Sequence, residues 1–328
     1  MTEKTQSHLR KNIGIGVLAG GSYGLLMRLG FEFEQLRNFL QIVSTAFLVG
    51  APFAVGAVAV FVASKAEQLT IRQQVAVASS AMLFFLLAMF AFLLEGLICI
   101  VLIVPVFFMA AIIGGLSAGL VIKYLRKPKP PLYGIALLPL LLGPIEAQLP
   151  PASQANLVST SIIIDASPAQ VFDQLAAVKD IQPDELGFSF MHLIGLPRPV
   201  EAAMNGQGVG AVRTSRWEKG VSFKEEISVW ERPHKLHYNF NIPPNSIPRE
   251  ALDRHVELGG EYFTVLNGGY DLEPTADGKT QLTLSTRYLN KSQLQAYGNT
   301  WGNIVLNDFH HSILGLMKNR AESANKLN

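Results

Sequence analysis

The distribution of apolar residues divides the chain into two unlike halves near residue 152. Long and nearly unbroken apolar runs fill the first half, whereas apolar and polar residues alternate over short segments in the second. A helix needs about 20 apolar residues to cross a bilayer, and a strand with one buried face alternates. We therefore predict an N-terminal α-helical transmembrane domain at residues 1–150 and a C-terminal soluble α+β domain at residues 152–328.

Four apolar runs are long enough to cross a membrane as helices. Glu95 and Gly96 separate the third run from the fourth, because a carboxylate is costly in hydrocarbon and tolerated at the end of a helical hairpin. A fifth run, at residues 132–149, is interrupted by two prolines and two polar residues, so it could span, re-enter or lie at the interface. The four predicted spans cover residues 13–30, 39–63, 75–94 and 97–122.

The basic residues beside these runs are unevenly divided between the two sides of the membrane. Lys and Arg accumulate on the cytoplasmic side, and nine of them lie on the side of the N-terminus, against Arg28 and Arg37 on the other side. We therefore predict a multi-pass protein of an inner or plasma membrane with a cytoplasmic N-terminus. Five crossings would place the C-terminal domain in the periplasmic or extracytoplasmic space, whereas four would leave it in the cytoplasm.

Glycines recur at every fourth position on two of the predicted spans. Gly16, Gly20 and Gly24 do so on the first span, and Gly115 and Gly119 on the fourth. Small residues at this spacing let helix backbones approach closely. Packing within the bundle is the first interpretation, and a homo-oligomer formed through these faces is the alternative.

Charge and cysteine content exclude several kinds of function. The 11 Lys and Arg of the first half, against 6 Glu, flank apolar runs and are not interleaved with aromatic residues, so nucleic-acid binding is not expected. A single cysteine, Cys99, permits neither an intramolecular disulfide nor a cysteine-based metal cluster. His310 and His311 point about 100° apart on a helix, so we predict no metal site and no cofactor.

The pattern of the second half predicts a strand, a helix, an antiparallel meander and a long C-terminal helix. Ser167 and Pro168 form an N-cap followed by proline in the first helical turn, which predicts a helix from residue 168 to about 177. The closing helix is expected at residues 293–324, where apolar residues follow a helical period. The expected strands cover residues 157–164, 209–217, 221–230, 236–242, 261–272 and 281–288.

A family resemblance adds to this interpretation over residues 157–325. It is carried by Ile162-Ile-Ile-Asp-Ala-Ser-Pro-Ala-Gln-Val-Phe-Asp, Gly208-Val-Gly with Arg213 and Trp217, Glu226 with Trp230-Glu-Arg-Pro, Gly260-Glu-Tyr-Phe with Tyr270-Asp-Leu-Glu-Pro, and Phe309. These motifs resemble the START-like (SRPBCC) superfamily, in its polyketide cyclase/dehydrase-like branch. The resemblance implies a helix-grip fold, in which a curved antiparallel sheet and a long C-terminal helix enclose an apolar cavity. It also implies lipids, steroids, polyketides or other hydrophobic molecules as ligands.

Aromatic residues on the expected sheet and closing helix are the candidates for lining such a cavity, although packing in the core is the ordinary role of each. Glu226 and Arg287 could form a charged pair inside, or lie on a solvated face of the sheet. His255, in the insertion between Asn241 and Gly260, could act as an acid or base at the cavity mouth, or be an ordinary loop residue. The aromatic candidates are Trp217, Trp230, Tyr238, Tyr262, Tyr270, Tyr288 and Trp301.

These observations support three functions. The leading hypothesis is a membrane-tethered domain that binds a hydrophobic or lipid-like molecule at the bilayer surface, with residues 188–200 and 243–257 as a mobile entrance. The first alternative is an enzyme of the polyketide cyclase/dehydrase-like type, with His255, Glu226 or Arg287 as the catalytic group. The second alternative is a small transporter or assembly subunit with a ligand-sensing domain, in which Glu95 would have access to water. No motif in the chain points directly to an enzyme.

Overall fold

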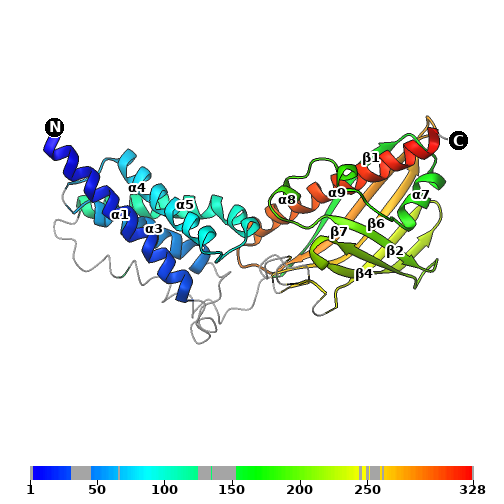
Figure 1. Ribbon diagram of the computed structural model, residues 1–328, viewed down its shortest axis with the longest axis horizontal. Helices are drawn as coiled ribbons and strands as arrows, with labels where there is room; N and C mark the ends of the chain where they lie inside the picture. Colours follow the sequence, from blue (N-terminus) through cyan, green and yellow to red (C-terminus); the bar gives the residue numbers. More distant parts are fainter. Residues whose placement is uncertain are drawn as a thin grey trace. The chain divides into compact units, whose positions relative to one another are not determined.

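The computed structural model consists of two compact units, Met1–Pro151 and Ala152–Asn328. It describes residues 3–30, 46–65, 67–124, 134, 153–243, 246–248, 251, 259–260 and 262–326. Figure 1 shows helices in the first unit, and a sheet with a long helix in the second. The fifth apolar run at 132–149, apart from Gly134, and the candidate His255 lie outside the described residues.

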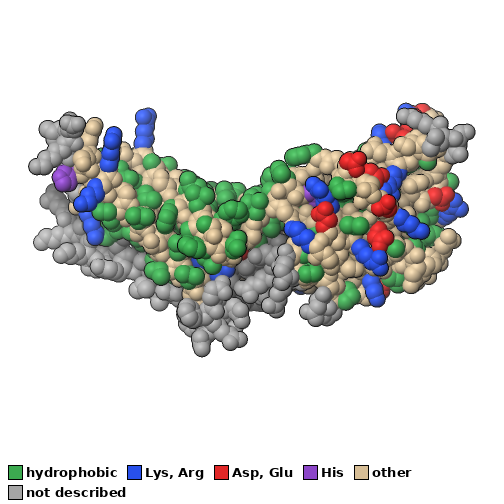
Figure 2. Space-filling model, viewed as in Figure 1, with side chains coloured by type: hydrophobic (Ala, Val, Ile, Leu, Met, Phe, Trp, Pro, Cys, Tyr) green, Lys and Arg blue, Asp and Glu red, His purple; other side chains and the backbone are tan. Residues whose placement is uncertain are grey.

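Helices form all of the described regular structure of the first unit. They are α1 (Glu3–Gly30), a π-helical turn η1 (Ala46–Gly50) that leads into α3 (Ala51–Ala63), α4 (Ile71–Ala91) and α5 (Leu97–Tyr124). Three segments are long and apolar enough to cross a membrane, namely Gln6–Gly30, Ile71–Ala91 and Leu97–Tyr124. Apolar side chains cover much of the visible surface of this unit, whereas charged side chains gather on the other (Figure 2).

The expectation of four spans is supported for three of them. The described part of the second run is the helix Phe47–Ala63, which is shorter than the other three. Its expected first residues, 39–45, lie outside the described part of the chain. Association with a membrane therefore rests on the length and apolar composition of three helices.

A buried ion pair joins the end of α1 to the turn between α4 and α5. Glu95 lies in this turn, as predicted, and its Oε1 accepts a hydrogen bond of 2.9 Å from Nε of Arg28. Arg28 Nη2 also donates to the carbonyl oxygen of Leu94 at 2.8 Å. The two side chains are only 6% and 7% exposed. Glu95 thus has a structural partner in the helical unit.

The repeated glycines allow helices of the first unit to pack within one chain. A Cβ added to Gly20 would lie 2.7 Å from both Ala59 Cβ and Val55 O on α3. On α5, a Cβ at Gly115 would lie 2.9 Å from Ala78 Cβ on α4. These contacts agree with the packing interpretation, and a homo-oligomer through the same faces stays an untested prediction.

The second unit is a seven-stranded antiparallel sheet with a long C-terminal helix. Its strand order is β1-β7-β6-β5-β4-β3-β2, and Figure 1 shows α9 running along the sheet. The elements are β1 (Gln154–Ile164), α7 (Pro168–Ala176), the short helices η2 (Pro183–Leu186) and α8 (Phe190–Leu193), β2 (Pro199–Asn205), β3 (Val212–Trp217), the turn η3 (Glu218–Gly220), β4 (Ser222–Glu231), β5 (Lys235–Asn241), β6 (Phe263–Pro274), β7 (Thr280–Asn290) and α9 (Gln295–Lys326).

One strand was missed by the sequence analysis. β2 forms the edge of the sheet and begins in the last two residues of the 188–200 stretch that we interpreted as a mobile entrance. It pairs with β3 from Glu201↔Arg216 to Asn205↔Val212. Its short length and a register shift next to Pro199 weaken the strand signal. The other expected elements of this unit are present, with ends displaced by a few residues.

The core of the second unit lies between the sheet and its helices. Ser167 starts α7 through a capping box, since its Oγ accepts from Gln170 N while Gln170 Oε1 accepts from Ser167 N. Phe172 on α7 and Met317 on α9 are buried against the inward side chains of Leu236 and Leu284. Register shifts in β4 and β6 add curvature to the sheet.

We predict that replacing Gly20 by Leu destabilises the first unit, because the added side chain must displace α3. Gly14→Leu on the same helix is the matched control, since a Cβ there meets nothing within 4 Å. Buried Cys99 is the only cysteine in the chain, so its reaction with a thiol-reactive fluorophore during heating reports the opening of this unit alone. The reaction should begin several degrees lower in Gly20→Leu than in Gly14→Leu, and equal onsets would contradict the packing described.

Candidate functional site

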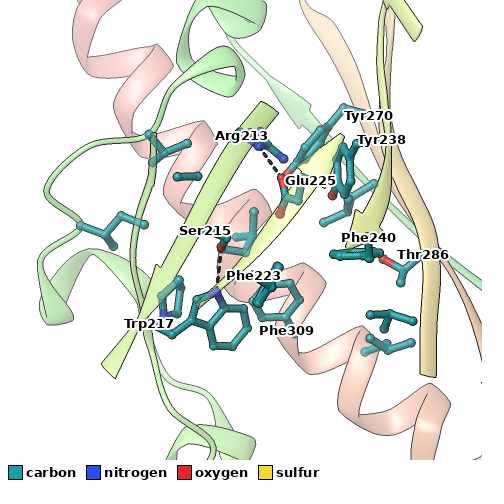
Figure 3. A pocket seen from close by; sticks show the side chains of 18 of the residues that line it. Arg213, Ser215, Trp217, Phe223, Glu225, Tyr238, Phe240, Tyr270, Thr286 and Phe309 are labelled. Carbon is teal, nitrogen blue, oxygen red and sulfur yellow. Dashed lines mark hydrogen bonds and ion pairs between the residues drawn. The ribbon is translucent and has the colours of Figure 1, made fainter. Parts of the chain in front are cut away.

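A cavity of about 100 Å³ lies between the sheet and α9 of the second unit. Its walls come from strands β2 to β7 and from α9, and most of the lining side chains are aliphatic or aromatic. Figure 3 shows these side chains converging from the strands toward the helix. An apolar enclosure with a few polar groups is the usual form of a small-molecule site.

The volume limits what the cavity can hold in this conformation. An apolar cavity of about 150 Å³ takes up benzene, and sites for drug-sized ligands measure about 300–1,000 Å³. A cavity of about 100 Å³ therefore fits only a very compact molecule unless side chains in its wall move. A steroid or polyketide would require a substantial rearrangement.

Strand alternation decides which charged residue of β4 faces the cavity. Phe223, Glu225 and Ile227 are buried on the inner face, whereas Glu226 is exposed and accepts a hydrogen bond of 2.7 Å from Asn241 Nδ2. Successive side chains of a strand point to opposite faces of the sheet. Of the two positions considered for Glu226, the structure shows the solvated face of the sheet, and its neighbour Glu225 faces the cavity.

The same rule places Arg287 outside the cavity. It is exposed on β7, between the buried residues Thr286 and Tyr288. Arg287 and Glu226 therefore do not form an interior pair. Of the three polar candidates for catalysis, these two lie on the outer face and His255 is not described.

The interior charged pair is formed by Arg213 and Glu225, which both line the cavity. Arg213 Nε donates to Glu225 Oε2 at 2.5 Å, and Arg213 Nη1 donates to the carbonyl oxygen of Leu175 at 2.7 Å. The two residues are 2% and 6% exposed. The guanidinium carbon lies 4.8 Å from the ring centroid of Tyr238 and 5.7 Å from that of Tyr270.

Burial and mutual attraction set the protonation of this cluster. Burial raises the pKa of the Glu225 carboxyl, and the Arg213 guanidinium opposes that rise. Burial lowers the pKa of Arg213, but the charge and hydrogen bond of Glu225 together with the nearby Tyr270 and Tyr238 outweigh it, so the net direction is upward and Arg213 keeps its charge. Burial also raises the pKa of Tyr238 and Tyr270, whose hydroxyls therefore stay protonated.

Three of the seven aromatic candidates line the cavity, namely Trp217, Tyr238 and Tyr270. Trp217 stacks on Phe309 of α9, with ring centroids 5.1 Å apart and an interplanar angle of 23°. Its Nε1 donates to Ser215 Oγ at 2.9 Å, which fixes the ring against β3 (Figure 3). Both stacked rings are half-buried.

The other four aromatic candidates do not line the cavity. Trp230 packs in the core, edge-to-face with Phe172 at 5.2 Å. Tyr288 lies beneath α9, where its hydroxyl donates to Asn303 Oδ1 at 2.9 Å. Tyr262 precedes β6, and Trp301 contacts Tyr297 on α9.

A buried histidine that was not predicted as a site residue lies behind the cavity wall. His310 on α9 is fully buried, with Nδ1 3.1 Å from Thr160 Oγ1 and Nε2 2.8 Å from Thr286 Oγ1. Burial, together with the neighbouring His311, lowers the pKa of His310 to about 4. His310 is therefore neutral near pH 7, and Thr286 links it to the cavity.

No protein-family model matches the chain, and no curated protein matches it. Solved structures with the Bet v1-like, START-like fold align with its C-terminal half. A protein from Nitrosospira multiformis is 17% identical, over 52% of this chain and 99% of that one, with a TM-score of 0.33. A point mutant of norcoclaurine synthase from Thalictrum flavum, in complex with a transition-state analogue, is 12% identical over 53% of this chain and 98% of that one, with a TM-score of 0.35. A Staphylococcus aureus protein of unknown function is 9% identical over 54% of this chain and 98% of that one, with a TM-score of 0.35.

We predict that Glu225→Ala destabilises the second unit by about 3–5 kcal/mol, because it leaves the Arg213 charge buried and unpaired. All three tryptophans, Trp217, Trp230 and Trp301, belong to this unit, so intrinsic fluorescence during denaturant unfolding reports its stability. Glu226→Ala, one residue along the strand and exposed, is the control and should change the midpoint little. Equal losses in the two variants would argue against the buried pair.

The buried histidine predicts a pH dependence of stability. The unfolded chain binds a proton at His310 below pH about 6.5, whereas the folded state does so only near pH 4. As the pH is lowered from about 6.5 to about 4, the free energy of unfolding should therefore decrease by about 3 kcal/mol in total. In His310→Gln this part of the slope should be absent while the contribution of carboxylates persists. Parallel pH profiles for the two proteins, measured by tryptophan fluorescence, would contradict the assignment.

Proposed function

We propose that the C-terminal unit binds a compact hydrophobic molecule carrying one polar group, and that the N-terminal helices tether this unit to a membrane. The observation that carries the proposal is the pair Arg213–Glu225, buried in the wall of an otherwise apolar cavity. Three helices that are apolar and long enough to span a bilayer support the tether.

The cost of burying charge supports a role in binding. Removing a guanidinium and a carboxylate from water costs several kcal/mol per ion, and their attraction repays this only when hydrogen bonds satisfy both groups. Well-packed apolar side chains would usually serve stability equally well. Arg213 offers only donors and Glu225 mainly acceptors, so a ligand hydroxyl or carbonyl could bind at the pair.

The tether would place the cavity near a source of ligand. Hydrophobic molecules partition into bilayers, so a binding unit held beside the membrane meets them at a higher local concentration than a freely diffusing one. The rings of Trp217 and Phe309 are only half-buried, so an outward rotation of this stacked pair would enlarge the cavity.

Binding can be measured on the full chain purified in detergent, with 4-fluorophenol, a compact aromatic probe that carries one polar group, observed by ¹⁹F NMR. Saturable binding above the partitioning into protein-free micelles is expected. Val305→Trp, in the α9 wall of the cavity, should abolish it by filling the space. Ile304→Trp is the matched control, because Ile304 is 42% exposed and outside the lining. Absence of saturable binding, or equal binding by both variants, would refute the proposal.

A further inference from the structure

The polar groups that join α9 to β1 and β7 form a continuous chain that ends at the cavity. Thr160 Oγ1 lies 3.0 Å from Asn307 Oδ1 and 3.1 Å from His310 Nδ1. His310 Nε2 then lies 2.8 Å from Thr286 Oγ1. Thr286 lines the cavity on the β7 side, beside Phe240 (Figure 3).

The chemistry of each member fixes where the protons lie. Asn307 Oδ1 can only accept, so the single hydroxyl hydrogen of Thr160 points to it. Thr160 must then accept from His310, which places the imidazole proton on Nδ1. In a neutral imidazole the other nitrogen is an acceptor. Thr286 therefore donates its hydroxyl hydrogen to His310 Nε2.

This order of donors determines what Thr286 presents to the cavity. Its only hydroxyl hydrogen is engaged behind the wall, so its oxygen has lone pairs left and no hydrogen to donate. Such a position binds a ligand O–H or N–H and disfavours an ether or carbonyl oxygen, because two acceptors cannot form a hydrogen bond.

We propose that His310 fixes Thr286 as an obligate hydrogen-bond acceptor in the cavity wall, and that Thr286 selects ligands carrying a hydroxyl or amine hydrogen. His310 acts through Thr286 and is a positioning residue. This inference rests on the proposed function for the existence of a ligand, and it names the ligand class more narrowly. A compact alcohol, phenol or amine is preferred over an equally large hydrocarbon, ketone or ether.

The tautomer of His310 can be measured without any ligand. With ¹⁵N-labelled histidine in the full chain, the resonance absent from His310→Gln identifies His310. The expected spectrum near pH 7 shows a protonated Nδ1 and an unprotonated, pyridine-type Nε2. A protonated Nε2 would overturn the inference, because Thr286 would then be free to donate into the cavity.

Ligand selection can be measured with two probes of nearly equal size, 4-fluorophenol and 4-fluorotoluene, through the ratio of their dissociation constants. Thr286→Val should reduce the preference for the phenol about five- to tenfold, the worth of one hydrogen bond. Thr286→Ser restores a hydroxyl and should keep the preference. Thr283→Val is the matched control, because Thr283 faces outward on the same strand and bonds Ser161.

The outcomes separate this inference from the proposed function. If the ratio is unchanged in Thr286→Val and falls instead in Glu225→Gln, the acceptor is the carboxylate and the inference fails while ligand binding stands. If neither probe binds saturably to the unmodified protein, the proposed function fails. The histidine spectrum still tests the proton order, even where Thr286→Val does not fold.

Discussion

Two opposite charges lie within the apolar interior of the C-terminal unit, at the junction of β3, β4 and α7. Arg213 has Glu225 on one side, the carbonyl oxygen of Leu175 on another, and the rings of Tyr238 and Tyr270 above it. A buried charge is tolerated only when its hydrogen-bonding groups are satisfied. The register of β3 against β4 is therefore constrained, because a slip of β3 by one residue would turn Arg213 outward, bring Arg216 toward the core and leave Glu225 buried without its partner.

The cavity exists because the long helix meets the sheet through polar contacts as well as apolar ones. His310 bonds threonines on β1 and β7, and Tyr288 bonds Asn303 across the same boundary. These bonds fix the position of α9, and the apolar side chains on either side leave about 100 Å³ unfilled. The same contacts between α9 and the sheet therefore set both the position of the helix and the volume of the cavity. A cavity of this volume is too small for the steroids and polyketides that the family resemblance implies.

The helical unit follows a different physical rule. Inside a lipid phase, helices as apolar as these would gain little from hydrophobic burial, so close backbone approach and satisfied polar groups would hold them together. Gly16 and Gly20 provide the close approach of α1 to α3, and Arg28 with Glu95 provides the polar contact at the helix ends. A carboxylate that looked like a candidate for transport in the sequence is part of this packing.

The sequence by itself determined the division into two units, the apolar helices and most strands of the sheet, because hydrophobic period and turn residues are local properties. It missed β2, whose edge position and shifted register leave a weak pattern. The sequence also named Trp217, Tyr238 and Tyr270 as candidates for lining a cavity, which they do. It could not separate them from four other aromatic candidates that do not line it, namely Trp230, Tyr262, Tyr288 and Trp301. Only tertiary structure decided that Glu225 faces inward and Glu226 outward, and that His310 forms a hydrogen bond with Thr286. Which face of a strand is buried depends on register and on the position of α9, and these are set by contacts between residues far apart in the chain.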